Sequence, residues 1–75
     1  MKYEIRFKIK ELRKENGLTQ KQLAKLVNKS ETGLASWEQG LSEPSVSDII
    51  LLCTIFGVSA DYMLNLEDET GAKRY

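Results

Sequence analysis

Apolar residues recur along most of this chain at the three- and four-residue spacing of amphipathic helices. One such stretch ends at Val27, polar residues 28–30 interrupt the pattern, and Leu34 and Trp37 resume it three residues apart. The apolar positions of the first stretch are Leu18, Leu23, Leu26 and Val27. The pattern predicts two short helices joined by a tight polar turn.

Capping residues mark where these two helices begin and end. The Thr19 hydroxyl can cap the first helix while Gln22, three residues on, reaches back to the backbone of the cap. Ser30 can cap the second helix, and Gly40 can adopt the left-handed conformation that ends it. Two helices of about two turns each are therefore expected between residues 19 and 40.

An earlier helix is indicated by Ile9, Leu12 and Arg13, which share one helical face, and it is expected to end at Asn16 and Gly17. Its start is open. Residues 3–9 alternate between apolar and charged with period two, which is typical of a strand, whereas Ile5 also fits the helical spacing. Residues 1–5 can therefore be extended or helical.

Two further helices are predicted after Pro44. Ser45 and Asp48 form a second capping box, and residues 46–56 are apolar on nearly every side, which predicts the central helix of the core. Gly57 ends this helix, and Ser59 caps a short last helix. We expect one all-α domain over residues 1–66, followed by a polar and mobile tail over residues 67–75.

Composition excludes most kinds of catalytic and metal-binding site. The 75 residues include no histidine and a single cysteine, which leaves no Cys/His zinc site, no disulfide pair and no Cys-His or Ser-His nucleophile pair. We therefore expect no enzymatic activity, no metal, no cofactor and no small-molecule ligand. The chain shows no signal peptide and no apolar run of membrane-spanning length, so we expect a cytoplasmic protein without membrane contact.

The formal net charge is zero, yet the charges are segregated along the chain. Residues 1–29 contain nine basic and three acidic residues, whereas residues 30–72 contain eight acidic residues and no basic one. This asymmetry indicates a polyanionic partner on one side of the molecule. The alternative is an ordinary solvated surface on which opposite charges face each other within the fold.

Three sequence blocks resemble the phage-repressor and Cro helix-turn-helix family, of the XRE type. They are IKELRKENGLTQKQLAKL at residues 9–26, WEQGLSEPS at 37–45 and FGVSADYMLN at 56–65. The resemblance covers about residues 5–66 and implies a compact five-helix, lambda-repressor-like domain. It also implies that this domain binds double-stranded operator DNA as a homodimer, with the third helix in the major groove.

The resemblance assigns roles to individual residues. It places base contacts at Glu31, Thr32, Ala35, Ser36 and Ser42. It places phosphate contacts at Gln20 and Gln39. We add five further candidate phosphate contacts, Thr19, Lys21, Lys25, Lys29 and Ser30, although Lys21 and Lys25 also fit an ordinary solvated helix face and Lys29 stands where the family turn is usually apolar. For Gln20 there is also a physical reason, because free N–H groups and the helix dipole favour an anion at a helix N-terminus.

Some residues depart from the family pattern. Glu31 is a carboxylate where many members carry a polar or basic side chain, and it can accept a hydrogen bond only from a base amine such as that of cytosine. Leu41 replaces a common lysine. These departures leave open an alternative function, a protein-interaction adaptor of anti-repressor or antitoxin type with a degenerate helix-turn-helix.

The resemblance further implies a salt bridge between Arg13 and Glu38 that links the first and third helices. The three-residue spacing of Leu34 and Trp37 predicts that Trp37 packs in the core. Dimerisation is expected through apolar residues on the last two helices that we expect to be exposed. These residues are Leu51, Tyr62, Met63 and Leu66.

Overall fold

The computed structural model describes residues 5–64, and all of its regular structure is helical. Five helices follow one another along the chain: α1 (Ile5–Glu15), α2 (Gln20–Leu26), α3 (Glu31–Gln39), α4 (Val46–Phe56) and α5 (Ala60–Met63). The predicted all-α, five-helix fold is confirmed. The predicted tail over residues 67–75, Leu66 and the conformation of residues 1–4 lie outside the described residues.

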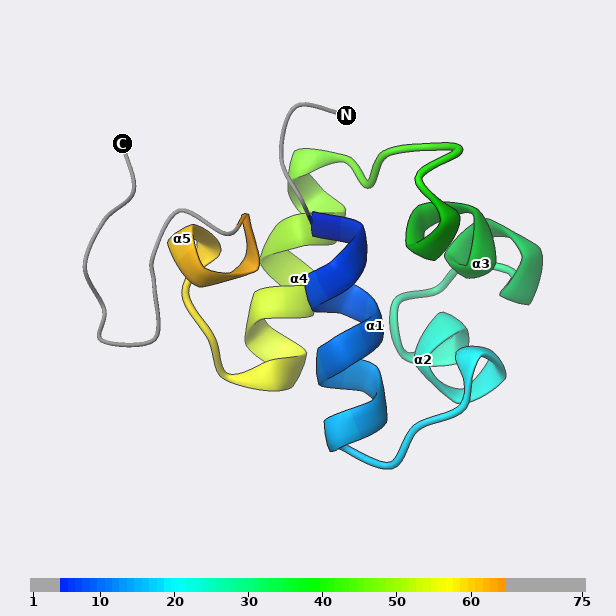
Figure 1. The fold of residues 1–75 in the computed structure, drawn as a ribbon, viewed down its shortest axis with the longest axis horizontal. Helices are drawn as coiled ribbons and strands as arrows, with labels where there is room; N and C mark the ends of the chain where they lie inside the picture. Colours follow the sequence, from blue (N-terminus) through cyan, green and yellow to red (C-terminus); the bar gives the residue numbers. More distant parts are fainter. Residues whose placement is uncertain (1–4, 65–75) are drawn as a thin grey trace.

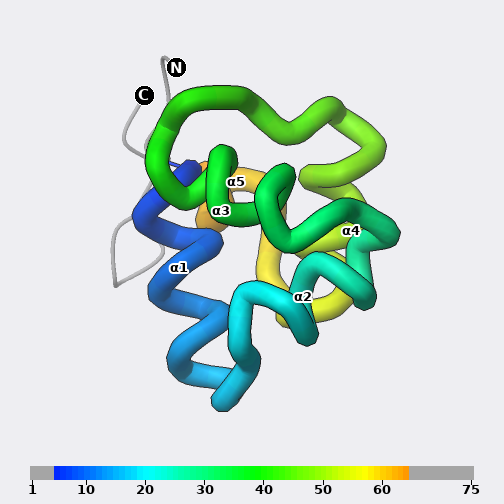
Figure 2. Tube along the Cα trace, turned by 90° about the vertical axis from the view of Figure 1, so that its right-hand side faces the viewer, coloured from blue at the N-terminus to red at the C-terminus, as the bar shows by residue number. Residues whose placement is uncertain are grey.

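Helix α1 lies in the middle of the molecule, with α2 and α3 on one side and α4 and α5 on the other (Figure 1). α3 contacts both α2 and α1, whereas α5 contacts α4 and α1. In the view turned by 90°, α2 and α3 form the near side of the molecule (Figure 2). The helix-turn-helix therefore occupies one side of the fold and leaves α3 accessible.

The predicted helix caps are all present. Thr19 and Ser45 each form a full capping box, and the Ser30 and Ser59 hydroxyls accept hydrogen bonds from the third residue of their helices. Gly40 takes the left-handed conformation after α3, with φ of 77°. The turn between α2 and α3 uses Asn28 in the same way, with φ of 58°, a conformation that asparagine tolerates better than most residues.

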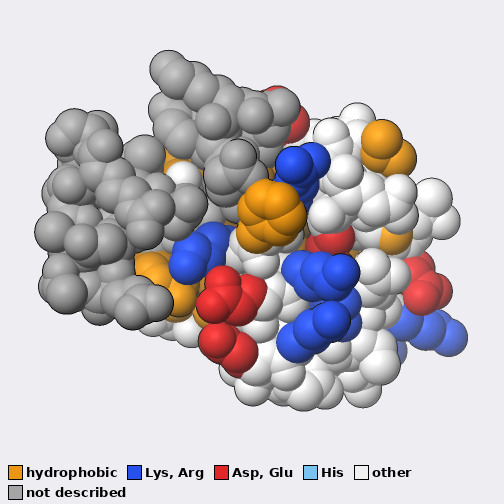
Figure 3. All heavy atoms as spheres, viewed as in Figure 1, with side chains coloured by type: hydrophobic (Ala, Val, Ile, Leu, Met, Phe, Trp, Pro, Cys, Tyr) orange, Lys and Arg blue, Asp and Glu red, His pale blue; other side chains and the backbone are white. Residues whose placement is uncertain are grey.

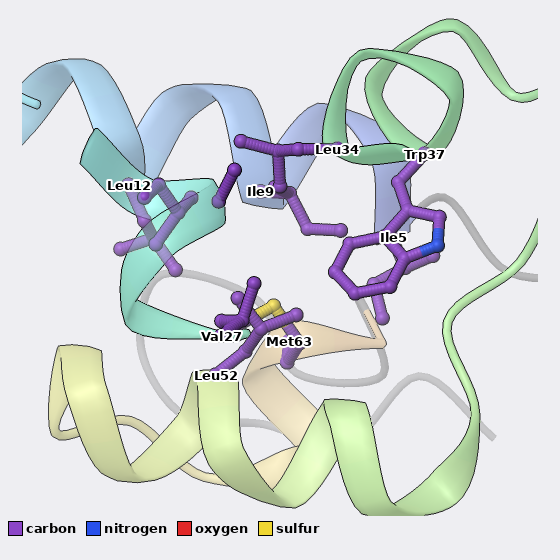
Figure 4. Packing of buried hydrophobic residues seen from close by; sticks show 10 residues of the cluster. Ile5, Ile9, Leu12, Val27, Leu34, Trp37, Leu52 and Met63 are labelled. Carbon is purple, nitrogen blue, oxygen red and sulfur yellow. The ribbon is translucent and has the colours of Figure 1, made fainter. Parts of the chain in front are cut away.

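The hydrophobic core lies between α1, α2, α3 and one face of α4 (Figure 4). Its buried members are Ile5, Ile9, Leu12, Leu23, Ala24, Val27, Leu34, Trp37, Leu52 and Met63. Trp37 is thus a core residue, as predicted. Ile5 belongs to α1, so the strand alternative fails at this residue.

One expectation about the core is wrong. α4 is not enclosed on all sides, because only Leu52 is fully buried and Val46 and Ile50 are exposed. A helix that is apolar all round gives no sequence signal for which face is covered. In α4 the face with Leu52 is covered and the positions of Val46 and Ile50 are open to solvent.

None of the described helices has the length and apolar character needed to cross a lipid bilayer.

We predict that adjacent leucines of α4 differ sharply in their contribution to stability. Leu52 has no exposed surface and Leu51 is 37% exposed. Leu52→Ala should lower the free energy of unfolding by about 2–5 kcal/mol because it leaves a cavity, and Leu51→Ala by less than about 1 kcal/mol. Urea denaturation followed by circular dichroism measures both values. Equal losses would contradict the one-sided packing of α4.

Candidate nucleic-acid interface

Helix α3 has one face in the core and one face in solvent. Leu34 and Trp37 point into the core (Figure 4). On the opposite side, Glu31, Thr32 and Gln39 are exposed, while Ala35 and Ser36 are half-buried. The structure therefore brings the four candidate base-contacting residues of α3 together on one accessible side.

The fifth candidate, Ser42, comes from the loop after α3 and joins this group. Its hydroxyl lies 2.7 Å from the hydroxyl of Ser36, and either oxygen can be the donor. Ser42 reaches this position because the left-handed Gly40 turns the chain back over the last turn of α3. The sequence contained no signal for this contact between residues six positions apart.

A charged network joins the three helices that border this face. Arg13 on α1 donates from Nε to Glu38 Oε2 of α3 at 2.7 Å and from Nη2 to Oε1 at 3.2 Å. The Arg13 and Glu38 side chains are only 11% and 3% exposed, so the predicted salt bridge is present and largely buried. Arg13 Nη1 also donates to the Leu18 carbonyl at 2.9 Å.

Helix α2 joins the same network through its first residue. Gln20 Nε2 donates to Glu38 Oε1 at 3.2 Å, which the sequence did not predict. The Gln20 carbonyl oxygen cannot bind a phosphate, but its second amide hydrogen and the free N–H groups at the start of α2 still can. Glu38 thereby holds side chains from α1 and α2 at the last turn of α3.

Two candidate phosphate-contacting hydroxyls already serve as helix caps. Thr19 Oγ1 accepts from the Gln22 amide at 3.1 Å, and Ser30 Oγ accepts from the Gly33 amide at 3.0 Å. Each hydroxyl hydrogen stays available to donate to a phosphate oxygen. Capping and anion binding are therefore compatible at both helix starts.

The candidate lysines have different surroundings. Lys21 and Lys25 are exposed on α2, whereas Lys29 Nζ lies 3.5 Å from Asp48 Oδ1 at the start of α4. Burial acts to raise the pKa of Asp48, but hydrogen bonds from Ser45 and the charge of Lys29 outweigh it, so the pKa lies below its ordinary value. Asp48 therefore stays ionised at neutral pH and partly neutralises Lys29.

A row of basic residues on α1 was not predicted from the sequence. Arg6, Lys10 and Lys14 are exposed and follow one another at four-residue spacing, so they share one side of the helix. The Arg6 guanidinium also occupies the space that a Cβ on Gly40 would need, which places Arg6 at the C-terminal end of α3. Figure 3 shows Lys and Arg side chains gathered where α1 faces the viewer. The regular spacing was the signal that could have identified this row.

The candidate dimer residues within the described part of the chain differ in how exposed their side chains are. Leu51 is exposed, and Tyr62 is half-buried with Lys8 Nζ 4.1 Å from the centre of its ring. Met63 has no exposed surface, so the expectation that it is exposed for a partner is wrong. Its side chain fills the core because α5 packs against both α1 and α4.

Within residues 5–64, no three His, Cys, Asp or Glu side chains are placed to hold a metal ion together.

Comparison with known proteins gives a consistent result. The family model described as helix-turn-helix matches residues 9–63. Over 66 residues the chain is 32% identical to the transcriptional regulator ImmR of Bacillus subtilis, covering 88% of this chain and 51% of ImmR. It is also 32% identical over 65 residues to the transcriptional activator BcrR of Enterococcus faecalis, covering 87% of this chain and 32% of BcrR. The chain thus spans about half the length of ImmR and about a third of the length of BcrR.

The fold is also similar to the crystal structure of the P22 c2 repressor protein in complex with a synthetic operator. The TM-score is 0.74 and the identity 28%, over 80% of this chain and 91% of the other. The matched proteins are transcriptional regulators, and the prediction that this chain is not an enzyme is confirmed at the level of its family.

We predict that breaking the Arg13–Glu38 pair strongly destabilises the fold. Glu38→Ala leaves a mostly buried guanidinium without its carboxylate and should lower the free energy of unfolding by about 3 kcal/mol. Glu31→Ala, which removes an exposed carboxylate from the same helix, is the control and should cost less than about 1 kcal/mol. The same loss for both variants in urea denaturation would show that the pair adds nothing beyond a surface charge.

Proposed function

The chain belongs to the helix-turn-helix family of transcriptional regulators, and on that premise we propose that it binds duplex DNA sequence-specifically by inserting α3 into the major groove. The observation that carries this proposal is the accessible polar side of α3, where Glu31, Thr32 and Gln39 are exposed. The same helix is anchored from behind by Leu34 and Trp37. A rigidly held helix with an open polar face suits the reading of base edges.

Phosphate contacts would surround the outward side of α3, which we call the reading face and which carries Glu31, Thr32, Ala35 and Ser36. Lys21 and Lys25 are exposed on α2, and the row of Arg6, Lys10 and Lys14 extends the positive charge along α1. The starts of α2 and α3 add hydroxyl and N–H donors at Thr19, Gln20 and Ser30, and Gln39 and Lys29 complete the proposed set. Such contacts would position the domain without reading sequence.

We further assign the protein to repression of transcription from a palindromic operator, in the cytoplasm. The similarity to the P22 c2 repressor over 80% of this chain supports repression, whereas the match to BcrR, named an activator, is the reason to test it. A promoter–reporter fusion that carries a site selected by the chain from a random duplex pool would distinguish repression from activation. Lower reporter output on expression of the chain would support repression, and higher output would assign activation.

A second candidate function is a protein-interaction adaptor. Exposed apolar side chains favour it, since Leu41, Val46 and Ile50 are 76%, 74% and 62% exposed. Selection of binding sites from a random duplex pool separates the two functions. An adaptor would enrich no sequence, and a DNA-binding regulator would enrich half-sites about one helical turn apart.

We predict that base-reading and phosphate-binding residues respond differently to substitution. Thr32→Ala should weaken binding to the selected duplex about 10-fold and leave binding to unrelated duplex unchanged. Lys21→Ala should weaken binding to both duplexes and reduce the slope of log affinity against log salt by about 1. Fluorescence anisotropy at several salt concentrations measures these effects.

The control is Lys8→Gln, because Lys8 pairs with Glu11 and lies over the Tyr62 ring, away from α3. It should leave the salt slope unchanged. Equal effects of Thr32→Ala on both duplexes would contradict the proposed role of α3.

We predict that the chain forms a two-fold dimer through α4 and α5, with Leu51 and Tyr62 contributing and Leu66 added from beyond the described residues. Leu51→Asp should convert the dimer to a monomer in sedimentation experiments, because it buries an unpaired charge in the interface. Leu41→Asp, at another exposed leucine, is the control and should stay dimeric. If the wild-type chain sediments as a monomer both alone and when bound to DNA, the predicted dimer is contradicted.

A further inference from the structure

The hydroxyl groups of Ser36 and Ser42 are hydrogen-bonded to each other, which limits how either can bind a base edge. The two hydroxyl oxygens are 2.7 Å apart at the end of the reading face of α3. A single serine hydroxyl rotates freely and can donate to or accept from any base edge, so it selects poorly. A hydroxyl that is already hydrogen-bonded to a neighbour has lost part of that freedom.

The hydrogen bond between the two hydroxyls fixes how many donors and acceptors the pair can present to a base. Each hydroxyl has one hydrogen and two lone pairs, and one of the two hydrogens is used between the oxygens. The pair therefore presents one outward donor beside outward acceptors. A donor next to an acceptor is also what the terminal amide of asparagine or glutamine presents.

We propose that Ser36 and Ser42 act as one unit that reads an adenine in the major groove. This inference rests on the proposed function. Adenine presents the N6 amine as a donor beside the N7 acceptor, and amide side chains bind it through both. Guanine presents two acceptors, O6 and N7, and the pair has only one outward hydrogen to offer them. Each pyrimidine presents a single polar group, so adenine is the one single base that satisfies both members of the pair. A G·C pair offers an acceptor beside a donor only across two bases, at guanine O6 and cytosine N4.

The main chain holds the pair together independently of the two hydroxyls. The Ser36 carbonyl accepts from the Leu41 amide at 3.0 Å and from the Ser42 amide at 3.4 Å. Removing either hydroxyl leaves these bonds and the left-handed Gly40 in place. Ser42→Ala therefore tests recognition without unfolding the end of α3, and a thermal melt of each variant checks this.

The experiment measures discrimination between adenine and guanine at each position of the site selected by the wild-type chain. Competition anisotropy would compare wild type, Ser36→Ala, Ser42→Ala and the double variant, with Ser47→Ala as a control at an exposed serine of α4. Wild type should prefer adenine at one position per half-site by about 10- to 100-fold. Each single variant and the double variant should lose this preference to the same extent, and Ser47→Ala should keep it.

Three results would overturn the proposal. In the first, Ser42→Ala keeps the full preference for adenine over guanine. In the second, the double variant loses as much of this preference as the two single variants lose together, which would mean that the serines act independently. In the third, the position of the selected site that responds to the substitutions is a guanine. In these cases the wild-type chain still binds a specific sequence, so the proposed function stands. If the wild-type chain selects no sequence from the random pool, both adenine recognition by Ser36 and Ser42 and the proposed function are contradicted.

Discussion

The ion pair between Arg13 and Glu38 is the interaction on which the arrangement of the helix-turn-helix depends. It connects α1 to the last turn of α3, and Gln20 brings α2 to the same carboxylate. Buried pairs of this kind add little net stability over apolar packing, but breaking one leaves a costly unpaired charge. The pair therefore disfavours any rotation of α3 that would separate the two groups. The direction in which α3 presents its polar face follows from this constraint together with the anchoring of Leu34 and Trp37 in the core.

The same arrangement explains why a chain of zero net charge can suit a polyanion. Exposed basic residues lie on α1 and α2, beside α3, whereas α4 and α5 contribute acidic residues and no basic one. Lys29 is an intermediate case, since it lies in the turn between α2 and α3 and Asp48 at the start of α4 partly neutralises it. The basic residues of α2 and the acidic residues of α4 and α5 are separated in space, because α2 and α3 lie on one side of α1 and α4 and α5 on the other (Figure 1).

Local features of the fold could be predicted from the sequence, and features set by tertiary packing could not. Thr19, Ser30, Ser45 and Ser59 cap helices by contacts within three residues, so each was readable from spacing alone. The covered face of α4 and the burial of Met63 depend on which helices pack alongside, and periodicity does not contain that information. The contacts of Gln20 with Glu38 and of Ser36 with Ser42 join residues 18 and six positions apart, and they arise from helix packing and from the Gly40 turn.

The network behind α3 fixes the direction of this helix, and for that reason we expect its outward side to meet base edges. Nuclear Overhauser effects between the chain and a duplex selected from a random pool test this expectation most directly. Thr32, Ala35 and Ser36 should show contacts to major-groove protons such as cytosine H5 and thymine methyl groups. Contacts that come only from α4 and α5, or that reach only minor-groove protons, would contradict it.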